Sequence, residues 1–189
     1  MGLFLSRNVV SFLVYLSSRK IELAGTEDMA CLISRTGRHL QRYDKGCRQV
    51  VGCIPYRYRN GGELEILLIS SQKGKAMMLP KGGWETDESM EEAALRETME
   101  EAGVKGKVEK MLGKWRYQSK SQARTYHVSY MFPMLVKEQL EFWPEKTVRQ
   151  RRWVSAQEAK DICQQWWMKE ALDVLISRVM QEQMRGDEL

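Results

Sequence analysis

The chain has 189 residues, and its 43% hydrophobic content is enough for a single sizeable core. Its apolar N-terminal stretch is too short to span a bilayer, which argues against a transmembrane segment. Its cysteines form no C-x-x-C pair, which argues against a zinc or redox site and for reduced thiols. A net charge of +5, from 30 Lys and Arg against 25 Asp and Glu, favours a polyanionic partner.

The predicted organisation is one domain over residues 35–184, an N-terminal extension over 1–34 and a short tail over 185–189. The extension begins MGLFLSRNVVSFLVYLSSRK and has no acidic residue before Glu22, as in an organellar transit peptide. Gly2 and Ser6 also give a weak match to a myristoylation signal. Two locations stay open: a cytoplasmic or nuclear protein with a tail, and mitochondrial import.

Two strands are predicted at the start of the domain, over residues 48–58 (RQVVGCIPYRY) and 64–71 (LEILLISS). The Asn60-Gly61-Gly62 turn joins them.

The segment 82–104 (GGWETDESMEEAALRETMEEAGV) predicts a helix. Ser89 followed by Glu92 is a capping box, and Gly103 is typical of a left-handed helix end. The helix is therefore expected to run from about residue 90 to about residue 102.

One face of this helix is expected to be acidic, because Glu97, Glu100 and Glu101 are spaced by three and four residues. The opposite face is expected to pack on a sheet through Leu95, Thr98, Met99 and Ala102. An acidic triplet alone is typical of a solvated helix. The preceding glycine turn favours a metal or phosphate site instead, since it allows the backbone to approach a ligand closely.

Further strands are predicted over 108–117, 124–136 and 149–154, with Pro133 indicating an edge or a bulge. A second capping box at Ser155 starts a helix that ends near residue 165, and a terminal helix covers 169–184. Strands around one central helix, followed by helices at the end, predict an α/β fold, an α/β/α sandwich around a mixed β-sheet.

The spacing of Gly82, Glu88 and the run from Arg96 to Val104 resembles the Nudix box, G-x5-E-x7-R-E-U-x-E-E-x-G-U, with U a bulky apolar residue. Thr98 is the one departure from this pattern. From about residue 35 to about residue 176 the chain is similar to diphosphoinositol polyphosphate phosphohydrolases, and Pro80-Lys81-Gly82-Gly83 is similar to plant members. A Pro-Lys-Gly turn also occurs in Nudix enzymes that cleave diadenosine tetraphosphate.

The resemblance implies the Nudix fold and hydrolysis of a phosphoanhydride by an activated water, with Mg²⁺ or Mn²⁺ as the cofactor. It implies that Glu97 and Glu101 bind the metal, with the Lys81 carbonyl as a third contact. Glu100 is the candidate proton acceptor. Arg96 completes the catalytic set, because it can pair with Glu88 and fix the preceding loop against the helix.

The predicted partner is a small polyphosphate, bound by a monomer without nucleic acid. Cations, hydroxyls and the glycine turn supply the candidate contacts, which are Arg48, Ser70, Ser71, Lys73, Lys75, Gly82, Gly83, Lys120, Arg124, Arg149 and Arg151. Arg149 and Arg151 alternate and are expected to share one strand face. His127 lies in an apolar strand and is expected to be structural.

Three functions follow from this sequence. The leading one is metal-dependent hydrolysis of diphosphoinositol polyphosphates. The alternative is hydrolysis of diadenosine polyphosphates or nucleoside diphosphate derivatives. A non-catalytic module that binds a phosphorylated ligand is the third, and the intact set of Glu97, Glu100 and Glu101 argues against it.

Overall fold

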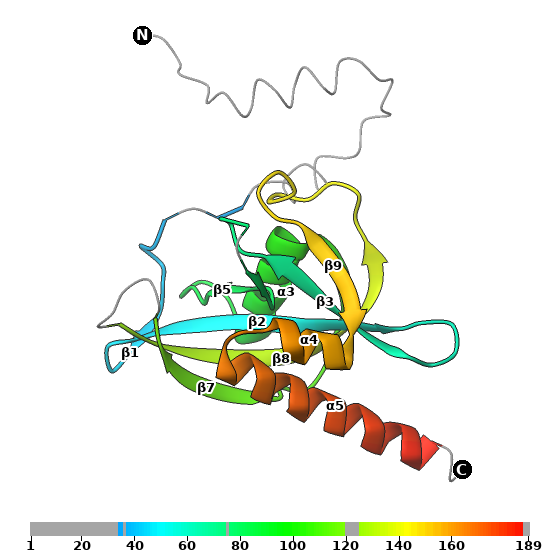
Figure 1. Cartoon of the computed structure of the whole chain (residues 1–189). Helices are drawn as coiled ribbons and strands as arrows, with labels where there is room; N and C mark the ends of the chain where they lie inside the picture. Colours follow the sequence, from blue (N-terminus) through cyan, green and yellow to red (C-terminus); the bar gives the residue numbers. More distant parts are fainter. Residues whose placement is uncertain (1–33, 36, 75, 120–124, 187–189) are drawn as a thin grey trace, which may run out of the picture. The chain divides into compact units, whose positions relative to one another are not determined.

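The computed structural model describes residues 34–35, 37–74, 76–119 and 125–186. In these residues one mixed sheet runs through the centre (Figure 1). Its strands are β1 (Tyr43–Asp44), β2 (Cys47–Tyr58), β3 (Leu64–Ser70), β4 (Met77–Met78), β5 (Lys81–Gly83), β6 (Val104–Val108), β7 (Gly113–Gln118), β8 (Tyr126–Gln139) and β9 (Arg151–Ser155). The helices are α3 (Met90–Ala102), α4 (Ala156–Ile162) and α5 (Trp166–Gly186).

The two long strands β2 and β8 form the middle of the sheet and run parallel to each other. The other strand pairs are antiparallel, with β3 and β5 against β2, β9 and β4 against β3, and β6 and β7 against β8. A parallel pair has both faces covered, and β2 accordingly carries apolar side chains on both faces.

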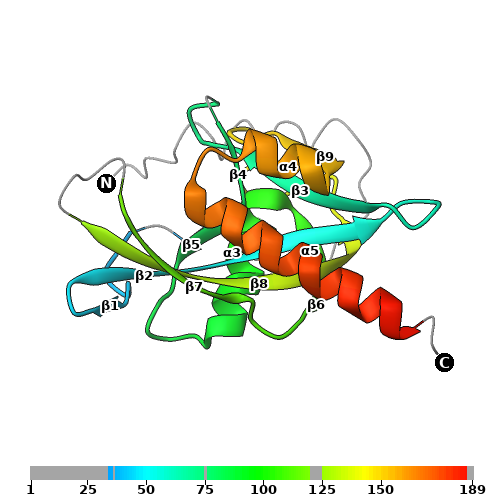
Figure 2. The same cartoon turned by 60° about the horizontal axis from the view of Figure 1, so that its bottom comes forward.

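Helices cover both faces of the sheet, with α3 on one side and α4 and α5 on the other (Figure 2). Alternation along β3 shows how one strand serves both layers: Leu67 and Ile69 pack towards α3, whereas Ile66 and Leu68 pack towards α4 and α5. The predicted α/β/α sandwich around a mixed sheet is therefore confirmed.

The strand predicted over 108–117 is correct for 113–117 and wrong as a continuous strand, because residues 109–112 separate β6 from β7. Both pair with β8, in succession along its length. Pro133 lies on β8 between the stretches that pair with β7 and with β6, so its missing N–H costs no ladder hydrogen bond. A proline can thus sit inside a central strand.

The other predicted strands and helices are present, but some of them begin or end at different residues than predicted. The last strand begins at Arg151 rather than at residue 149, α4 ends at Ile162, and α5 extends over Trp166–Gly186. At α4 the Ser155 hydroxyl accepts the backbone N–H of Glu158 at 3.2 Å, while the Glu158 carboxylate pairs with Arg152. No helix in the described ranges is long and apolar enough to cross a membrane.

Candidate active site

The ends of α3 are fixed by local contacts, as predicted. Ser89 accepts the N–H of Glu92 through its hydroxyl, the Glu92 carboxylate accepts the N–H of Ser89, and Gly103 is left-handed with φ 61°. The packing face differs from the prediction at one position. Leu95 is 39% exposed, and Ala93 and Ala94 are buried against the sheet instead.

Arg96 clamps the preceding loop to α3. Its Nε and Nη2 bind the two Glu88 carboxylate oxygens at 2.8 and 2.7 Å, which confirms the predicted pair. Nη2 also donates to the Gly83 carbonyl at 3.0 Å, and Nη1 to Glu97 at 2.8 Å. One guanidinium thus connects the loop, β5 and the acidic face of the helix.

Strand β5 lies directly against the acidic face of α3. A Cβ at Gly82 would overlap the Glu97 carboxylate, so glycine is what allows the carboxylate to lie at this position. The backbone N–H of Lys81 donates to Glu101 at 2.8 Å. The glycine strand therefore sets the position of two of the three acidic side chains.

Arg149 is buried and holds Glu101 from the other side. Its guanidinium pairs with the carboxylates of Glu101 and Glu145 and donates to the Ser70 carbonyl at 2.9 Å. Arg149 precedes β9, so the expectation that it alternates with Arg151 on one strand face is wrong.

Burial and mutual repulsion act on the acidic residues of α3. Burial raises the pKa of Glu100 to about 7, and the nearby Glu97 charge adds to this rise. Burial also raises the pKa of Glu101 to about 7, against the opposing attraction of Lys81 and Arg149. The pKa of Glu97 is raised by burial as well. Burial thus disfavours the ionised form of all three carboxylates.

The residues present fit a hard divalent cation in their donor chemistry. Carboxylate and carbonyl oxygens are what Mg²⁺ prefers, and Glu97 and Glu101 are one helical turn apart. Among the described residues no three acidic, histidine or cysteine side chains converge on a common point for a metal. Arg96 and Arg149 occupy the carboxylates instead, and binding a cation requires the carboxylates to turn towards it.

Two predicted substrate contacts make structural bonds. Arg151 donates to the carbonyls of Ala102 and Gly103 at 3.1 Å and to Leu140, so it satisfies the C-terminal end of α3. Ser70 accepts the N–H of Gln150 through its hydroxyl at 2.9 Å. The Arg151 guanidinium is thus engaged by backbone carbonyls at the end of α3.

The other predicted substrate contacts do not lie together in one part of the structure. Ser71 and Lys73 lie in the loop after β3, and Lys73 is exposed. Gly83 packs against Arg48 and Gln41, and the Arg48 Nε donates to the Gln41 amide oxygen at 2.8 Å. Three predicted contacts lie outside the described residues, namely Lys75, Lys120 and Arg124.

Sequence reasoning missed two residues that contact this site. Glu145 pairs with Arg149, and its backbone N–H donates to the Glu100 carbonyl at 3.2 Å. Arg35 binds Glu85 at 2.5 Å, and its own N–H meets the Glu100 carboxylate at 3.4 Å. The four-residue spacing from Glu145 to Arg149 was a usable signal, whereas nothing local marks Arg35.

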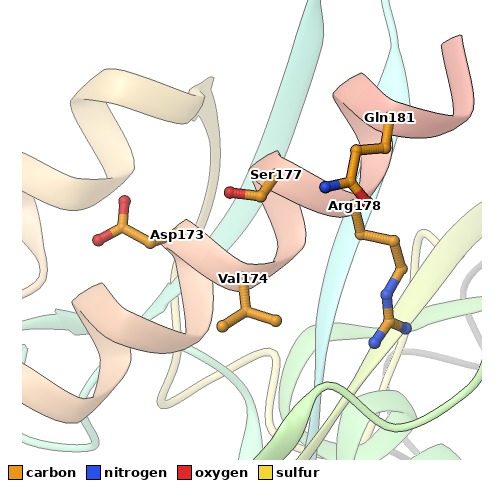
Figure 3. A pocket seen from close by; sticks show the side chains of 5 residues that line it. All are labelled: Asp173, Val174, Ser177, Arg178 and Gln181. Atoms are coloured by element: carbon orange, nitrogen blue, oxygen red, sulfur yellow. The ribbon is translucent and has the colours of Figure 1, made fainter. Parts of the chain in front are cut away.

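A groove of about 390 Å³ lies elsewhere, along the outer side of α5 (Figure 3). Its lining residues are Asp173, Val174, Ser177, Arg178 and Gln181. Arg178 donates to the carbonyl of Met111 at 3.1 Å and so binds the loop between β6 and β7. This groove is on the opposite side of the sheet from α3, and we assign no chemistry to it.

The fold and the acidic helix define the class of protein, an α/β/α sandwich with a carboxylate site suited to a divalent cation. The NUDIX domain model matches residues 48–175 of the chain. The chain therefore belongs to the Nudix family.

Two relatives and one solved structure illustrate the range of similarity. Nudix hydrolase 17, mitochondrial, of Arabidopsis thaliana is 63% identical over 161 residues, covering 82% of this chain and 88% of that protein. Diphosphoinositol polyphosphate phosphohydrolase 3-alpha of Mus musculus is 35% identical over 126 residues, covering 65% and 73%. A C. elegans Ap4A hydrolase in a binary complex superposes with a TM-score of 0.57 at 20% identity, covering 70% and 98%, which shows a shared fold.

Proposed function

We propose that this Nudix protein hydrolyses the phosphoanhydride of diphosphoinositol polyphosphates with the help of Mg²⁺. One observation carries the metal-dependent chemistry: two carboxylates of α3, Glu97 and Glu101, meet the glycine strand β5, and burial raises the pKa of Glu101 and of the neighbouring Glu100 to about 7. A divalent cation would stabilise the ionised form of these buried carboxylates. Similarity to the mouse phosphohydrolase supports the choice of substrate.

In this proposal Glu97, Glu101 and the Lys81 carbonyl hold the cation. Glu100 accepts the proton of the attacking water, since a carboxyl whose pKa is near neutrality can both take and return a proton. The cation supplies neutralisation of the charge on the phosphoryl oxygens. Arg96 keeps the loop, β5 and α3 in register, so that these groups are already placed when the substrate binds.

The reaction adds one water across a P–O–P bridge. It releases inorganic phosphate and leaves a phosphate monoester on the inositol ring. The bond broken is the one between the terminal phosphorus and the bridging oxygen, and the proton of water is taken up by Glu100. A phosphoryl transfer of this kind depends mainly on positioning and charge neutralisation.

A substrate panel tests the proposal directly. The full chain is incubated with a diphosphoinositol polyphosphate, diadenosine tetraphosphate and a nucleoside diphosphate sugar, each with Mg²⁺, Mn²⁺ or a chelator. We expect phosphate release from the inositol substrate with Mg²⁺, and loss of activity with the chelator that added Mg²⁺ restores. Nucleotide products without phosphate release from the inositol substrate would favour the diadenosine alternative.

We also propose import into mitochondria, on two grounds. Residues 1–34 carry Arg7, Arg19 and Lys20 and no acidic residue before Glu22, and the Arabidopsis relative is named mitochondrial.

A further inference from the structure

A short segment before β1 lies along the loop that leads from β5 into α3. Its described residues are 34–35 and 37–42, and we call it the N-terminal strap. The Arg42 N–H donates to the Trp84 carbonyl at 2.9 Å, a main-chain bond that holds the strap in place. The match to the NUDIX domain begins only at residue 48, so the family model does not account for the strap.

The Arg42 side chain fastens the same loop. Its guanidinium donates to the carbonyls of Glu85 and Thr86 at 2.9 and 3.0 Å. It also lies over the Trp84 ring, 4.4 Å from the centroid. The Thr86 N–H in turn donates to the Leu40 carbonyl of the strap at 2.9 Å. Main-chain and side-chain bonds together therefore fix the strap against the loop before α3.

The N-terminal end of the strap reaches the acidic face of α3. The backbone N–H of Arg35 meets the Glu100 carboxylate at 3.4 Å. The Arg35 guanidinium binds Glu85 at 2.5 Å and both carboxylate oxygens of Asp87 at 3.0 and 3.1 Å. The hydroxyl oxygen of Ser34, the preceding residue, is buried. Arg35 thus connects the loop before α3 to a carboxylate in the last turn of the helix.

The Glu100 carboxylate is held less closely by the Arg96 clamp than its neighbour Glu97 is. Arg96 lies 3.6 Å from the Glu100 carboxylate and binds Glu97 at 2.8 Å. The Arg35 N–H, at 3.4 Å, is the nearer of these two donors to Glu100. Because a donor to a carboxylate restricts the directions in which the carboxylate can turn, Arg35 acts on the orientation of Glu100.

We propose that Arg35 is a positioning residue, which orients the Glu100 carboxylate through its backbone N–H while its guanidinium anchors the strap on Glu85 and Asp87. This inference rests on the proposed function, in which Glu100 accepts the proton of the attacking water. A proton acceptor has to face that water in the reactive complex, and a carboxylate that is free to rotate spends less time in this orientation. The strap then contributes to catalysis without contacting the substrate.

The side chain of Arg35 can be replaced without unfolding the domain. It is 41% exposed, and exposed ion pairs contribute little to stability. Arg35→Gln removes the charge that anchors the strap and keeps the backbone N–H, and Arg35→Lys keeps the charge. Arg59→Gln is the matched control, because Arg59 is an exposed arginine in the turn between β2 and β3.

The first measurement is made without substrate. Hydrogen exchange of the isotope-labelled full chain, followed by NMR, gives the protection factor of the amide at residue 35, which is the factor by which structure slows its exchange. We expect Arg35→Gln and Glu100→Ala each to lower this factor by about threefold or more. The Arg42 amide, which is bonded to Trp84, is the internal control and should stay within about twofold. Unchanged protection at residue 35 in both variants would overturn the proposal.

The second measurement is turnover of whichever compound of the substrate panel is cleaved. We expect Arg35→Gln to lower kcat by about three- to tenfold and to leave KM within about twofold, because the orientation of Glu100 matters in the chemical step rather than in binding. Arg35→Lys should regain most of the lost kcat, and Arg59→Gln should keep both constants within about twofold of the wild type. A raised KM with an unchanged kcat would make Arg35 a substrate contact and would overturn the positioning role.

The two proposals fail separately. If the inositol substrate is cleaved and Arg35→Gln keeps the wild-type kcat, the positioning role falls and the proposed reaction holds. If a different compound of the panel is cleaved, the proposed substrate falls, and kcat on that compound decides the role of Arg35. If no compound is cleaved, the proposed reaction falls, and the protection factors alone decide whether Arg35 holds Glu100.

Discussion

The acidic residues of α3 differ in the partners that hold them. Glu97 meets Arg96 and Gly82, Glu101 meets Arg149 and the Lys81 N–H, and Glu100 accepts the N–H of Arg35 and lies 3.6 Å from Arg96. Because the set of contacts differs from one carboxylate to the next, single substitutions can compare their contributions.

Replacement of either proposed metal ligand tests the site at this scale. Glu97→Gln and Glu101→Gln are each expected to lower turnover by at least about 100-fold, because an amide is a weaker ligand for a divalent cation. The folded state should persist, which circular dichroism and thermal unfolding would check. Glu91→Gln, on the exposed side of the same helix, should keep near wild-type turnover. Wild-type rates in either ligand variant would refute the assignment.

Arg149 and Arg48 were both predicted to bind substrate, and we expect them to contribute differently to the free energy of unfolding. Arg149→Met should lower the free energy of unfolding by about 3 to 5 kcal/mol, because it leaves the Glu101 and Glu145 carboxylates without their buried partner. Arg48→Gln loses one hydrogen bond to an amide and should cost about 1 kcal/mol. Urea unfolding at equilibrium distinguishes them, and equal losses would contradict the structural role of Arg149.

At the scale of elements, the contact of β5 with α3 decides the geometry of the site. Antiparallel pairing with Val50–Gly52 of β2 fixes β5, and α3 is fixed by its caps and by the Arg96 clamp. The acidic face and the glycine strand therefore meet without a side chain between them.

Gly82→Ala is a test of this contact. Its methyl group would overlap the Glu97 carboxylate, so we expect the carboxylate to move and turnover to fall by at least about tenfold. Gly62→Ala is the control, since its φ of 83° makes alanine unfavourable in the hairpin between β2 and β3 while no atom lies within 4 Å. The control should lose stability and keep its turnover. Full activity of Gly82→Ala would show that the contact is not required.

The C-terminal end of α3 also depends on a contact with another element, the strand β9. The last turn of the helix contains no basic residue, and Arg151 from β9 supplies the missing cation to the carbonyls of Ala102 and Gly103. A residue 49 positions away in sequence thus completes the helix.

At the scale of the whole molecule, the core lies within the strands and helices from β2 to α5. Among the described residues, both apolar clusters lie between Val51 and Val179. Hydrolysis is therefore expected to depend on this part of the chain.

Removal of residues 1–33 tests the proposed division of the chain. The truncated protein should keep the kcat/KM of the full chain within about twofold and should lose mitochondrial import, which a fluorescent fusion in plant cells would show. A fusion of residues 1–34 alone should be imported. Import of the truncated protein, or cytoplasmic retention of both fusions, would contradict the proposed targeting role.

The limits of α3 and the pairing of Arg96 with Glu88 could be predicted from the sequence, because both depend on contacts between residues no more than 8 positions apart. The central strands β2 and β3 were placed correctly for a similar reason, since a short turn joins them. Strand ends elsewhere depended on distant partners. The break between β6 and β7 follows from their successive pairing with β8, which no local pattern indicates.

Sequence by itself determined the fold class, the family and the acidic set on α3, because capping, periodicity and motif spacing are properties of neighbouring residues. Only the tertiary structure determined which basic side chain pairs with which carboxylate or carbonyl group. Arg149 and Arg151 are two positions apart, yet one is held by buried carboxylates and the other by helix carbonyls. The strength of a charge–charge interaction depends on distance and burial in space, and neither can be obtained from spacing along the chain.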